Sequence, residues 1–276
     1  MSSELESQRI GFIGCGAMAS ALAGGLAKMG VESTQMLAAD PSEEQRARFE
    51  SALGLRTVAE NVELVEQSDV VVLCVKPGIV PKALSDLAGK TDLARPLWIS
   101  IAAGVTLGSL ENVLPAGARI IRAMPNTPAL VGEGATAYFA NAATRDEEGE
   151  TAERLFSAVG LTWRTRDEEQ LNAVTGLSGS GPAYVFLFLE GLIAAGIAEG
   201  LPAEAAEKLA FQTVYGAAKL ALQDERDPAT LRKQVSSPGG TTVAGLAELN
   251  AGGLEDLLHQ AVKAATRRSR ELASES

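Results

Sequence analysis

The sequence has few of the residues that bind metals or form disulfides. Its 276 residues contain one histidine, His259, and two cysteines, Cys15 and Cys74. One imidazole and two cysteines far apart in sequence do not give the spacing of a metal site, so we expect none. Both cysteines lie in apolar segments, which favours small buried residues over a disulfide. This use of cysteine is typical of a reducing compartment, and we expect a cytoplasmic protein.

Positive charge is also scarce. There are 24 Lys and Arg residues against 35 Asp and Glu, and the net charge is −11. The basic residues form no run that could neutralise a row of phosphates, so we do not expect nucleic acid as a partner. The first six residues are polar and acidic, and they lack the basic start and apolar stretch of a secretory signal.

One long apolar stretch, residues 182–201, approaches the length of about 20 residues that a membrane span requires. Glu190 lies in its middle, glycines follow, and no Lys or Arg flanks either end, which argues against a span. We expect instead a helix buried on most sides, in a bundle or in a subunit interface, and no membrane partner.

The first half of the chain, residues 1–165, alternates short β-branched runs with helical stretches. The runs are Arg9–Ile13, Met36–Ala39, Val70–Leu73, Leu97–Ile101 and Arg119–Ile121. The segments 17–29, 43–53 and 79–88 between them are amphipathic or rich in alanine, and each is long enough for a right-handed crossover helix. This alternation predicts an α/β domain with a doubly wound parallel sheet of the Rossmann type.

The second half, residues 166–276, follows a different pattern. From about Asp167 no comparable strand occurs, and Ala, Leu and Glu recur with helical spacing between glycines and prolines. We expect an all-helical domain with one helix from Pro202 through Leu222 and a final helix from Leu254 to Leu272. The glycine-rich segment Thr175–Pro182 is predicted to be a loop that joins two helices.

The segment Gly14–Ala19 matches the pattern G-x-G-x-x-A directly after the first strand. The first glycine of this pattern permits a tight turn, the second lets the backbone approach a pyrophosphate, and the small last residue lets the helix pack close to the sheet. The helix that begins near Ala17 directs free amides at the anion. The motif in this context predicts dinucleotide binding.

Asp40 ends the second strand about 20 residues after the glycines, where a carboxylate can accept hydrogen bonds from the adenosine ribose. In that position it would repel a 2′-phosphate and favour NADH over NADPH. Asp40 could equally be a turn or cap residue before Pro41, and the sequence leaves both interpretations open.

Ligands of open parallel sheets lie beyond the carboxyl ends of the strands. Three segments are predicted to leave strands at this edge, namely Val75–Gly78, Ala102–Thr106 and Arg122–Pro128. Their small residues and prolines give rigid backbone that can approach a nicotinamide and its ribose closely. Each segment, taken alone, could also be an ordinary turn between a strand and a helix.

In the second half, Ser236–Thr242 immediately precedes the helical stretch Val243–Leu249. A helix N-terminus with free amides can hold a small carboxylate without any arginine, because the amides and the positive end of the helix dipole attract it. The alternative is plain capping of the helix by Ser or Thr.

With these segments in their order, the chain resembles the pyrroline-5-carboxylate reductase family over almost its whole length. The matching segments are Ile10–Gly16, Val75–Pro77, Ala102–Thr106, Arg122–Pro128, Ser178–Tyr184 and Ser236–Thr242. The resemblance implies an oxidoreductase that uses NADPH or NADH to reduce the C=N bond of 1-pyrroline-5-carboxylate to L-proline, the last step of proline biosynthesis. It also implies a helical domain that forms homodimers, commonly stacked into decamers.

The resemblance further implies roles for individual residues. The residues expected at the cofactor, with Asp40 added from its position after the second strand, are Ile13, Gly14, Cys15, Gly16, Ala17, Met18, Asp40, Asn61, Val75, Lys76, Pro77 and Ala103. The residues expected at the substrate are Glu168, Ser237, Gly239, Gly240, Thr241 and Thr242. Thr242 matches the family's threonine whose hydroxyl faces the ring nitrogen, which makes it the candidate catalytic residue.

Two other functions remain open from the residues alone. One is a reductase or dehydrogenase of another imine or of a 3-hydroxy acid, since this architecture hosts related chemistries. The hydroxy-acid enzymes usually place a lysine on the helix between the domains, and here no lysine falls between Lys90 and Lys208. The other is a non-catalytic protein that binds a dinucleotide as a sensor or scaffold.

Overall fold

The computed structural model describes residues 8–275, and its contacts divide the chain into two compact units. The first unit comprises the residues up to Ser180 together with those from Lys263 onward, and the second is Gly181–Val262. The predicted boundary at residues 165 and 166 differs from this division. The difference arises because helix α7 (Gln170–Val174) contacts strands β6 and β7 and therefore belongs with the sheet.

The first unit contains one eight-stranded sheet in the order β3-β2-β1-β4-β5-β6-β7-β8. Its strands are β1 (Ile10–Ile13), β2 (Met36–Ala39), β3 (Arg56–Val58), β4 (Val70–Leu73), β5 (Leu97–Ser100), β6 (Ile120–Met124), β7 (Gly134–Ala140) and β8 (Gly160–Arg164). Strands β1 to β6 are parallel, while β7 pairs antiparallel with β6 and parallel with β8. The predicted parallel sheet is confirmed, although the sequence reading missed β3, β7 and β8.

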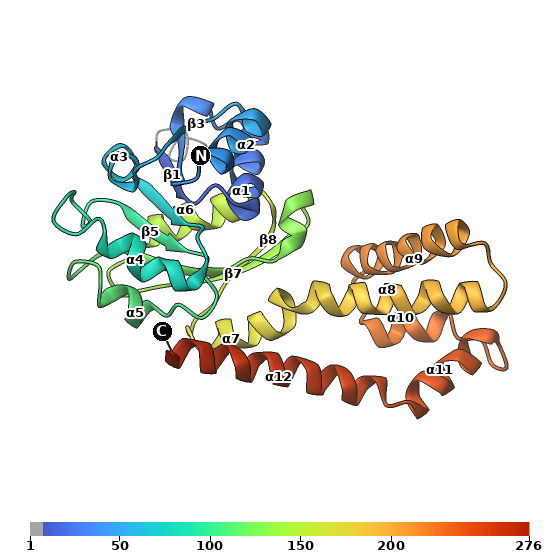
Figure 1. Cartoon of the computed structure of the whole chain (residues 1–276). Helices are drawn as coiled ribbons and strands as arrows, with labels where there is room; N and C mark the ends of the chain where they lie inside the picture. The colour runs from blue at the N-terminus through green and yellow to red at the C-terminus, as the bar shows by residue number, and fades with distance from the viewer. Residues whose placement is uncertain (1–7, 276) are drawn as a thin grey trace. The chain divides into compact units, whose positions relative to one another are not determined.

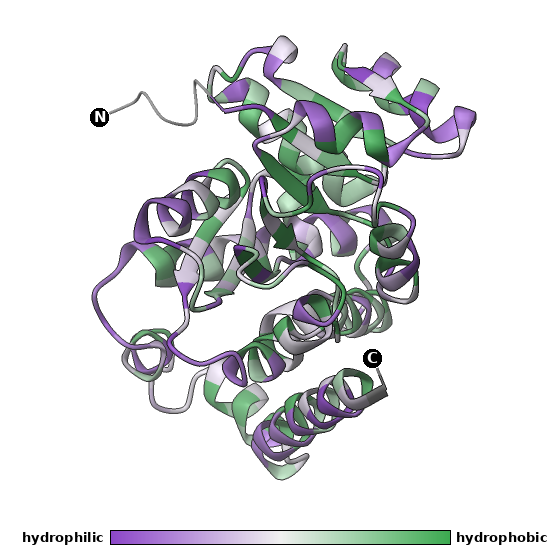
Figure 2. Ribbon diagram, turned by 90° about the vertical axis from the view of Figure 1, so that its left-hand side faces the viewer, coloured by the Kyte–Doolittle hydropathy of each residue, from purple (hydrophilic) through white to green (hydrophobic). Residues whose placement is uncertain are grey.

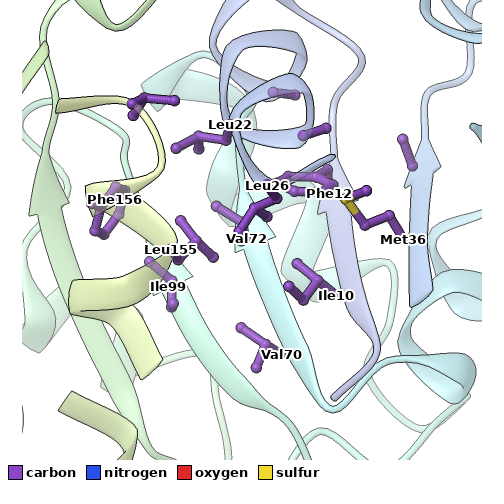
Figure 3. Packing of buried hydrophobic residues seen from close by; sticks show 14 of the residues in the cluster. Ile10, Phe12, Leu22, Leu26, Met36, Val70, Val72, Ile99, Leu155 and Phe156 are labelled. Atoms are coloured by element: carbon purple, nitrogen blue, oxygen red, sulfur yellow. The ribbon is translucent and has the colours of Figure 1, made fainter. Parts of the chain in front are cut away.

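Helices cover both faces of this sheet (Figure 1). The helical elements of the first unit are α1 (Ala17–Lys28), η2 (Ser33–Gln35), α2 (Glu43–Leu53), α3 (Asn61–Gln67), η3 (Pro77–Ile79), α4 (Val80–Ser85), α5 (Leu107–Glu111), η4 (Thr127–Val131), α6 (Asp146–Ser157) and α7. On one face, β-strand residues pack with α1, α2 and α6. Figure 3 shows the part of this cluster in which Leu22 and Leu26 of α1 and Leu155 and Phe156 of α6 face the strands. On the other, they pack with α3, α4 and α5.

Burial from both faces explains why the strands appear in the sequence as unbroken apolar runs rather than as alternating patterns. Every residue of β1, β2, β4 and β5 is buried. Figure 2 shows the same feature as hydrophobic colour along the central strands, with mixed colour on the surrounding helices. The predicted helical segments 17–29 and 43–53 correspond to α1 and α2, and the segment 79–88 contains the shorter α4.

The second unit is helical, as predicted. It consists of α8 (Gly181–Ala198), α9 (Ala203–Gln223), α10 (Pro228–Gln234), α11 (Thr241–Ala251) and the first part of α12 (Leu254–Glu275). Helices α8 and α9 pack against each other. The expected helix after Pro202 and the expected final helix are both confirmed.

The prediction of a loop at Thr175–Pro182 is wrong. The segment Thr175–Gly179 forms a π-helical turn, η5, which links α7 to α8, and the Ser180 N–H donates to the Thr175 carbonyl oxygen at 2.8 Å. The glycines suggested a break, yet Gly176, Gly179 and Gly181 all keep negative φ. Glycine permits a break without forcing one, and here the helical hydrogen bonds continue through it.

Helix α8 has no buried residue within this chain. The single chain does not provide the expected burial, so burial of α8 in a bundle or interface formed with another subunit stays a prediction. Among the described residues, the continuous helix Gln170–Ala198 is long and apolar enough to cross a membrane by length and composition. Its apolar surface needs a cover that the single chain does not supply.

Candidate dinucleotide and substrate sites

The glycine turn after β1 has the geometry that the motif predicts. Gly14 has a φ of +102°, which only glycine adopts readily, and its N–H donates to the Ala39 carbonyl oxygen at 2.7 Å. A Cβ on Gly14 would lie 3.0 Å from Cγ1 of Val75, so the turn lies tightly against the end of β4. Ala19 is fully buried. The small residues are thus required where chain segments approach each other.

Gly16 is the N-cap of α1, and no side chain caps this end of the helix. A Cβ on Gly16 would meet no described atom within 4 Å, which leaves open space in front of the turn. An uncapped N-terminus beside open space offers its amides and the positive end of the helix dipole to an anion. The residues present therefore fit a pyrophosphate.

The Asp40 carboxylate joins the glycine turn to the start of α2. Oδ2 accepts from the Cys15 N–H at 3.0 Å and Oδ1 accepts from the Ser42 N–H at 2.9 Å. Arg46 donates to the Asp40 carbonyl oxygen at 2.7 Å. Asp40 thus acts as a turn residue, as one of the two interpretations of the sequence predicted. Each carboxylate oxygen can accept further bonds, so a role at the ribose stays a prediction.

The environment of Cys15 is unfavourable for a thiolate. Burial, followed by the nearby negative charge of Asp40, raises the pKa of the Cys15 thiol to about 12. Burial also raises the pKa of Cys74. Both cysteines are free, so they are small apolar side chains in the wall of the turn.

The remaining residues predicted at the cofactor follow neighbouring strands. Asn61 begins α3 shortly after β3, Val75 to Pro77 follow β4, and Ala103 follows β5. Because β3, β2, β1, β4 and β5 are consecutive and parallel in the sheet, their carboxyl ends share one edge with the glycine turn. The structure brings the predicted residues to that edge, and their contact with a cofactor stays a prediction.

The segment predicted to leave the sheet at Arg122 begins later. Arg122 to Met124 belong to β6, and the connection starts at Pro125. The Asn126 side chain accepts from the Ala135 N–H at 2.8 Å and donates to the Ser178 carbonyl oxygen at 3.2 Å. It therefore ties the end of β6 to β7 and to the π-helical turn. This bridge was not predictable from the segment alone, because Asn126 and Ser178 are far apart in sequence.

Glu168 is already engaged within the first unit. Its Oε1 accepts from Nη1 of Arg122 at 2.7 Å and from the Leu107 N–H at 2.9 Å. The ion pair of Arg122 with Glu168 was not predicted from the sequence. The signal was present, because a charged residue inside the apolar run from Ile120 to Met124 needs a buried counter-charge.

In the second unit, Ser236–Thr242 forms the start of α11. The helix begins at Thr241, its N-cap Gly240 has no side-chain cap, and Gly239 has a φ of +72°. The Gly240 N–H donates to the Ser237 carbonyl oxygen at 2.9 Å, which closes the turn. No Ser or Thr hydroxyl caps this end, so the capping alternative does not account for it, and free amides remain as in α1.

Other hollows lie at the amino ends of the strands. One of about 370 Å³ is lined by Arg9, Met36 and Arg56, among others, which are at or beside the first residues of β1, β2 and β3. The G-x-G-x-x-A turn and the uncapped start of α1 lie instead after the carboxyl end of β1. Among residues 8–275 there is also no group of three or more His, Cys, Asp or Glu side chains that could hold a metal ion. The carboxyl edge is the better candidate for chemistry.

Two family models match the chain. Residues 9–104 match a model described as NADP oxidoreductase, coenzyme F420-dependent, and residues 168–272 match one described as pyrroline-5-carboxylate reductase dimerisation. A pyrroline-5-carboxylate reductase of Pseudomonas aeruginosa is 44% identical over 271 residues, which cover 98% of this chain and 99% of that protein. The human pyrroline-5-carboxylate reductase 2 is 42% identical, with coverage of 96% and 84%.

Solved structures agree over the whole length. A pyrroline-5-carboxylate reductase from Coxiella burnetii has a TM-score of 0.90 at 39% identity and covers 97% of this chain and 99% of its own. A Plasmodium falciparum pyrroline carboxylate reductase with NADP bound has a TM-score of 0.87 at 32% identity, with coverage of 98% and 100%. The similarity therefore spans both compact units.

Proposed function

The chain belongs to the pyrroline-5-carboxylate reductase family, and on that premise we propose that it reduces 1-pyrroline-5-carboxylate to L-proline with NAD(P)H. The reaction adds a hydride to the imine carbon and a proton to the ring nitrogen, so the C=N double bond becomes a single bond. The observation that carries the proposal is the pair of uncapped helix ends, α1 after a glycine turn and α11 after Ser236–Gly240.

The first unit holds the dinucleotide. The uncapped end of α1 is suited to the pyrophosphate, with Ile13 to Met18 around it, and Asp40 lies beside the turn. Lys76, Ala103 and their neighbours follow β4 and β5 on the side of the nicotinamide. When bound, the reduced nicotinamide supplies the hydride, and the chain contributes its position and the exclusion of competing reactions.

The second unit supplies the anchor for the substrate carboxylate. We assign this anchor to Ser237 and to the amides of Gly239, Gly240 and Thr241 at the start of α11. The support is the absence of a side-chain cap at Gly240, together with the positive end of an eleven-residue helix. An anchored carboxylate places the five-membered ring in one orientation, which is where most of the rate gain of such a reaction originates.

Thr242 is assigned to the ring nitrogen. Thr242 is the second residue of α11 and is half-buried, and its hydroxyl can donate a hydrogen bond to the ring nitrogen or accept one from it. The imine is itself basic and can enter as the iminium, so the chain need not supply a strong acid. Thr242 then orients the ring or relays a proton. Replacement by alanine should lower turnover and leave dinucleotide affinity unchanged.

The activity is tested by following the absorbance of NADH and NADPH in parallel, with and without 1-pyrroline-5-carboxylate. We expect oxidation of the dinucleotide only when the imine is present, and formation of proline in equal amount. Binding of the dinucleotide without oxidation would instead support a sensor or scaffold. Oxidation with a different imine or with a keto acid, but not with this imine, would support the alternative reductase.

The chain associates with itself through its helical half. We propose that the chain forms homodimers that stack into a decamer, and the exposed apolar side chains of α8 and α9 support this assembly. We also propose that the protein is cytoplasmic, and the two free cysteines support this compartment. Sedimentation equilibrium tests the assembly against the chain mass of 28.6 kDa. Fractionation of cells that produce the protein tests the compartment.

A further inference from the structure

A carboxylate that the family resemblance places near the substrate is held by the fold itself. Glu168 Oε1 accepts from Nη1 of Arg122 at 2.7 Å and from the Leu107 N–H at 2.9 Å. The Arg122 side chain is 5% exposed and that of Glu168 is 26% exposed. A guanidinium that is this deeply buried requires a counter-charge, because an unpaired buried charge is strongly destabilising.

The second partner of Glu168 connects it to the dinucleotide edge. Leu107 is the first residue of α5, and the turn Ala102–Thr106 precedes it directly after β5. The Thr106 hydroxyl accepts from the Ser109 N–H at 3.1 Å, so Thr106 and Glu168 each satisfy one of the free donors of this helix end. The conformation of the turn therefore depends on Glu168.

The last turns of α12 hold the turn from its other side. Gly104 has a φ of +79°, and a Cβ added to it would lie 3.0 Å from Cβ of Leu272. The Ser269 hydroxyl donates to Oδ1 of Asn172 at 2.7 Å in a buried hydrogen bond. Because Asn172 lies on α7, four residues after Glu168, the same short segment holds both the turn and the helix that packs on it.

We propose that Glu168 is a positioning residue for the nicotinamide end of the dinucleotide and not a ligand of the imine. It joins Arg122 of β6 to the N-terminus of α5 and thereby holds the turn Ala102–Thr106 in one conformation. This inference rests on the proposed function, because the turn contains Ala103, which is expected to line the cofactor.

The test compares two ligands that share the adenosine half but not the nicotinamide. We would measure the Kd of NADH and of ADP-ribose by calorimetry for the wild type and for Glu168→Gln. A misplaced turn should raise the Kd of NADH by about tenfold and lower kcat, since small displacements of a binding loop have large effects on orientation. The Kd of ADP-ribose and the KM of the imine at saturating NADH should stay within about twofold.

Two further variants keep the test valid if the buried arginine destabilises Glu168→Gln. In the background of Arg122→Met, Glu168→Gln retains an acceptor for the Leu107 N–H, whereas Glu168→Ala removes it, and neither leaves an unpaired buried charge. The alanine variant should bind NADH more weakly than the glutamine variant. The matched control is Glu44→Gln, which removes an exposed carboxylate paired with Arg48, both about 70% exposed, and it should change neither Kd.

Three results would overturn the inference. A raised KM for the imine with an unchanged Kd for NADH assigns Glu168 to the substrate. An equal loss of affinity for NADH and ADP-ribose indicates general damage to the fold. No change in either ligand removes any role in positioning. The binding measurements need no turnover. A wild type that binds NADH without oxidising it would contradict the proposed function, but the Kd values of NADH and ADP-ribose could still be compared between variants.

Discussion

The two compact units differ in how they cover their apolar side chains. In the first, helices close both faces of the sheet, and large side chains such as Trp98, Phe12 and Phe156 are fully buried. In the second, Ala206 and Ala210 are the buried hydrophobic residues among those described, while Phe186, Leu187 and many others are largely exposed. The first unit has a hydrophobic core of its own, whereas the second exposes apolar side chains that another subunit would have to cover.

The difference indicates where each unit obtains its stability. Burying a Leu or Phe side chain contributes about 1.5–3 kcal/mol, and the first unit gains this within one chain. The second unit leaves Leu187 68% and Leu209 57% exposed, so the corresponding free energy is available only on association. The match of residues 168–272 to a dimerisation model agrees with this division.

The largest expected effect comes from placing a charge on the uncovered surface. Leu187→Glu should prevent association, because the interface would bury an unpaired carboxylate. A cost of about 3 kcal/mol or more raises the dissociation constant by about a hundredfold. Sedimentation velocity measures the change. Val131→Glu is the control, because Val131 is 76% exposed in the first unit and its replacement should leave the assembly intact. If both variants dissociated to the same extent, the association surface could not be assigned to the second unit rather than the first.

A cavity in the closed core has an effect of similar size. Phe156→Ala should lower the free energy of unfolding by about 3–5 kcal/mol, since Phe156 is fully buried between α6 and the sheet. Urea denaturation at two protein concentrations measures it, and the loss should be the same at both.

The matched variant in the second unit is Phe211→Ala, at a side chain that is 48% exposed in the single chain. Its loss should become smaller as the protein is diluted, because the side chain contributes this free energy only in the associated state, where it is covered. A loss for Phe211→Ala that is independent of concentration would mean that the second unit stabilises itself.

Much of the first unit could be predicted from the sequence, because short local patterns specify its strands and its glycine turn. A strand buried on both faces is an unbroken apolar run, and the glycine motif specifies its own turn, so β1, β2, β4 and α1 were predictable. Strand β8 was not, because it lies at the sheet edge and its Leu161 and Trp163 are exposed, at 70% and 49%. The antiparallel β7 was missed because only the short 3-10 helix η4, and no long crossover helix, separates it from β6.

The candidate site divides in the same way. The two uncapped helix ends were predictable, because glycine and serine patterns report local backbone geometry. The ties between distant segments were not, since Arg122 and Glu168 are far apart in sequence and only the fold brings them together. The π-helical turn at Thr175–Gly179 was also missed, because glycine-rich composition predicts a break and helical hydrogen bonds outweighed it.

A smaller effect tests whether the first unit alone selects the dinucleotide. Asp40→Ser removes a negative charge beside the glycine turn, and it should improve affinity for NADPH relative to NADH by about tenfold, or about 1.4 kcal/mol. Fluorescence titration with both dinucleotides measures the ratio without turnover. Lys28→Ser, on the last residue of α1, is a control that should leave the ratio unchanged. An unchanged ratio in Asp40→Ser would limit Asp40 to its hydrogen bonds with Cys15 and Ser42.

The smallest effect concerns the thiol in the wall of the turn. The pKa of Cys15 is raised from 9.0 to about 12. A raised pKa means that the folded state keeps its proton while the unfolded state loses it, so this group stabilises the fold fully below pH 9 and loses its contribution as the pH rises from 9 to 12. Iodoacetamide at pH 8 should therefore label Cys15 at least about tenfold more slowly in the native protein than in urea. Mass spectrometry of the Cys15 peptide follows the rate. Rapid native labelling would show that the turn opens to solvent. The contrast between a closed first unit and an open second unit would then apply to the sheet core but not to the edge proposed to bind the dinucleotide.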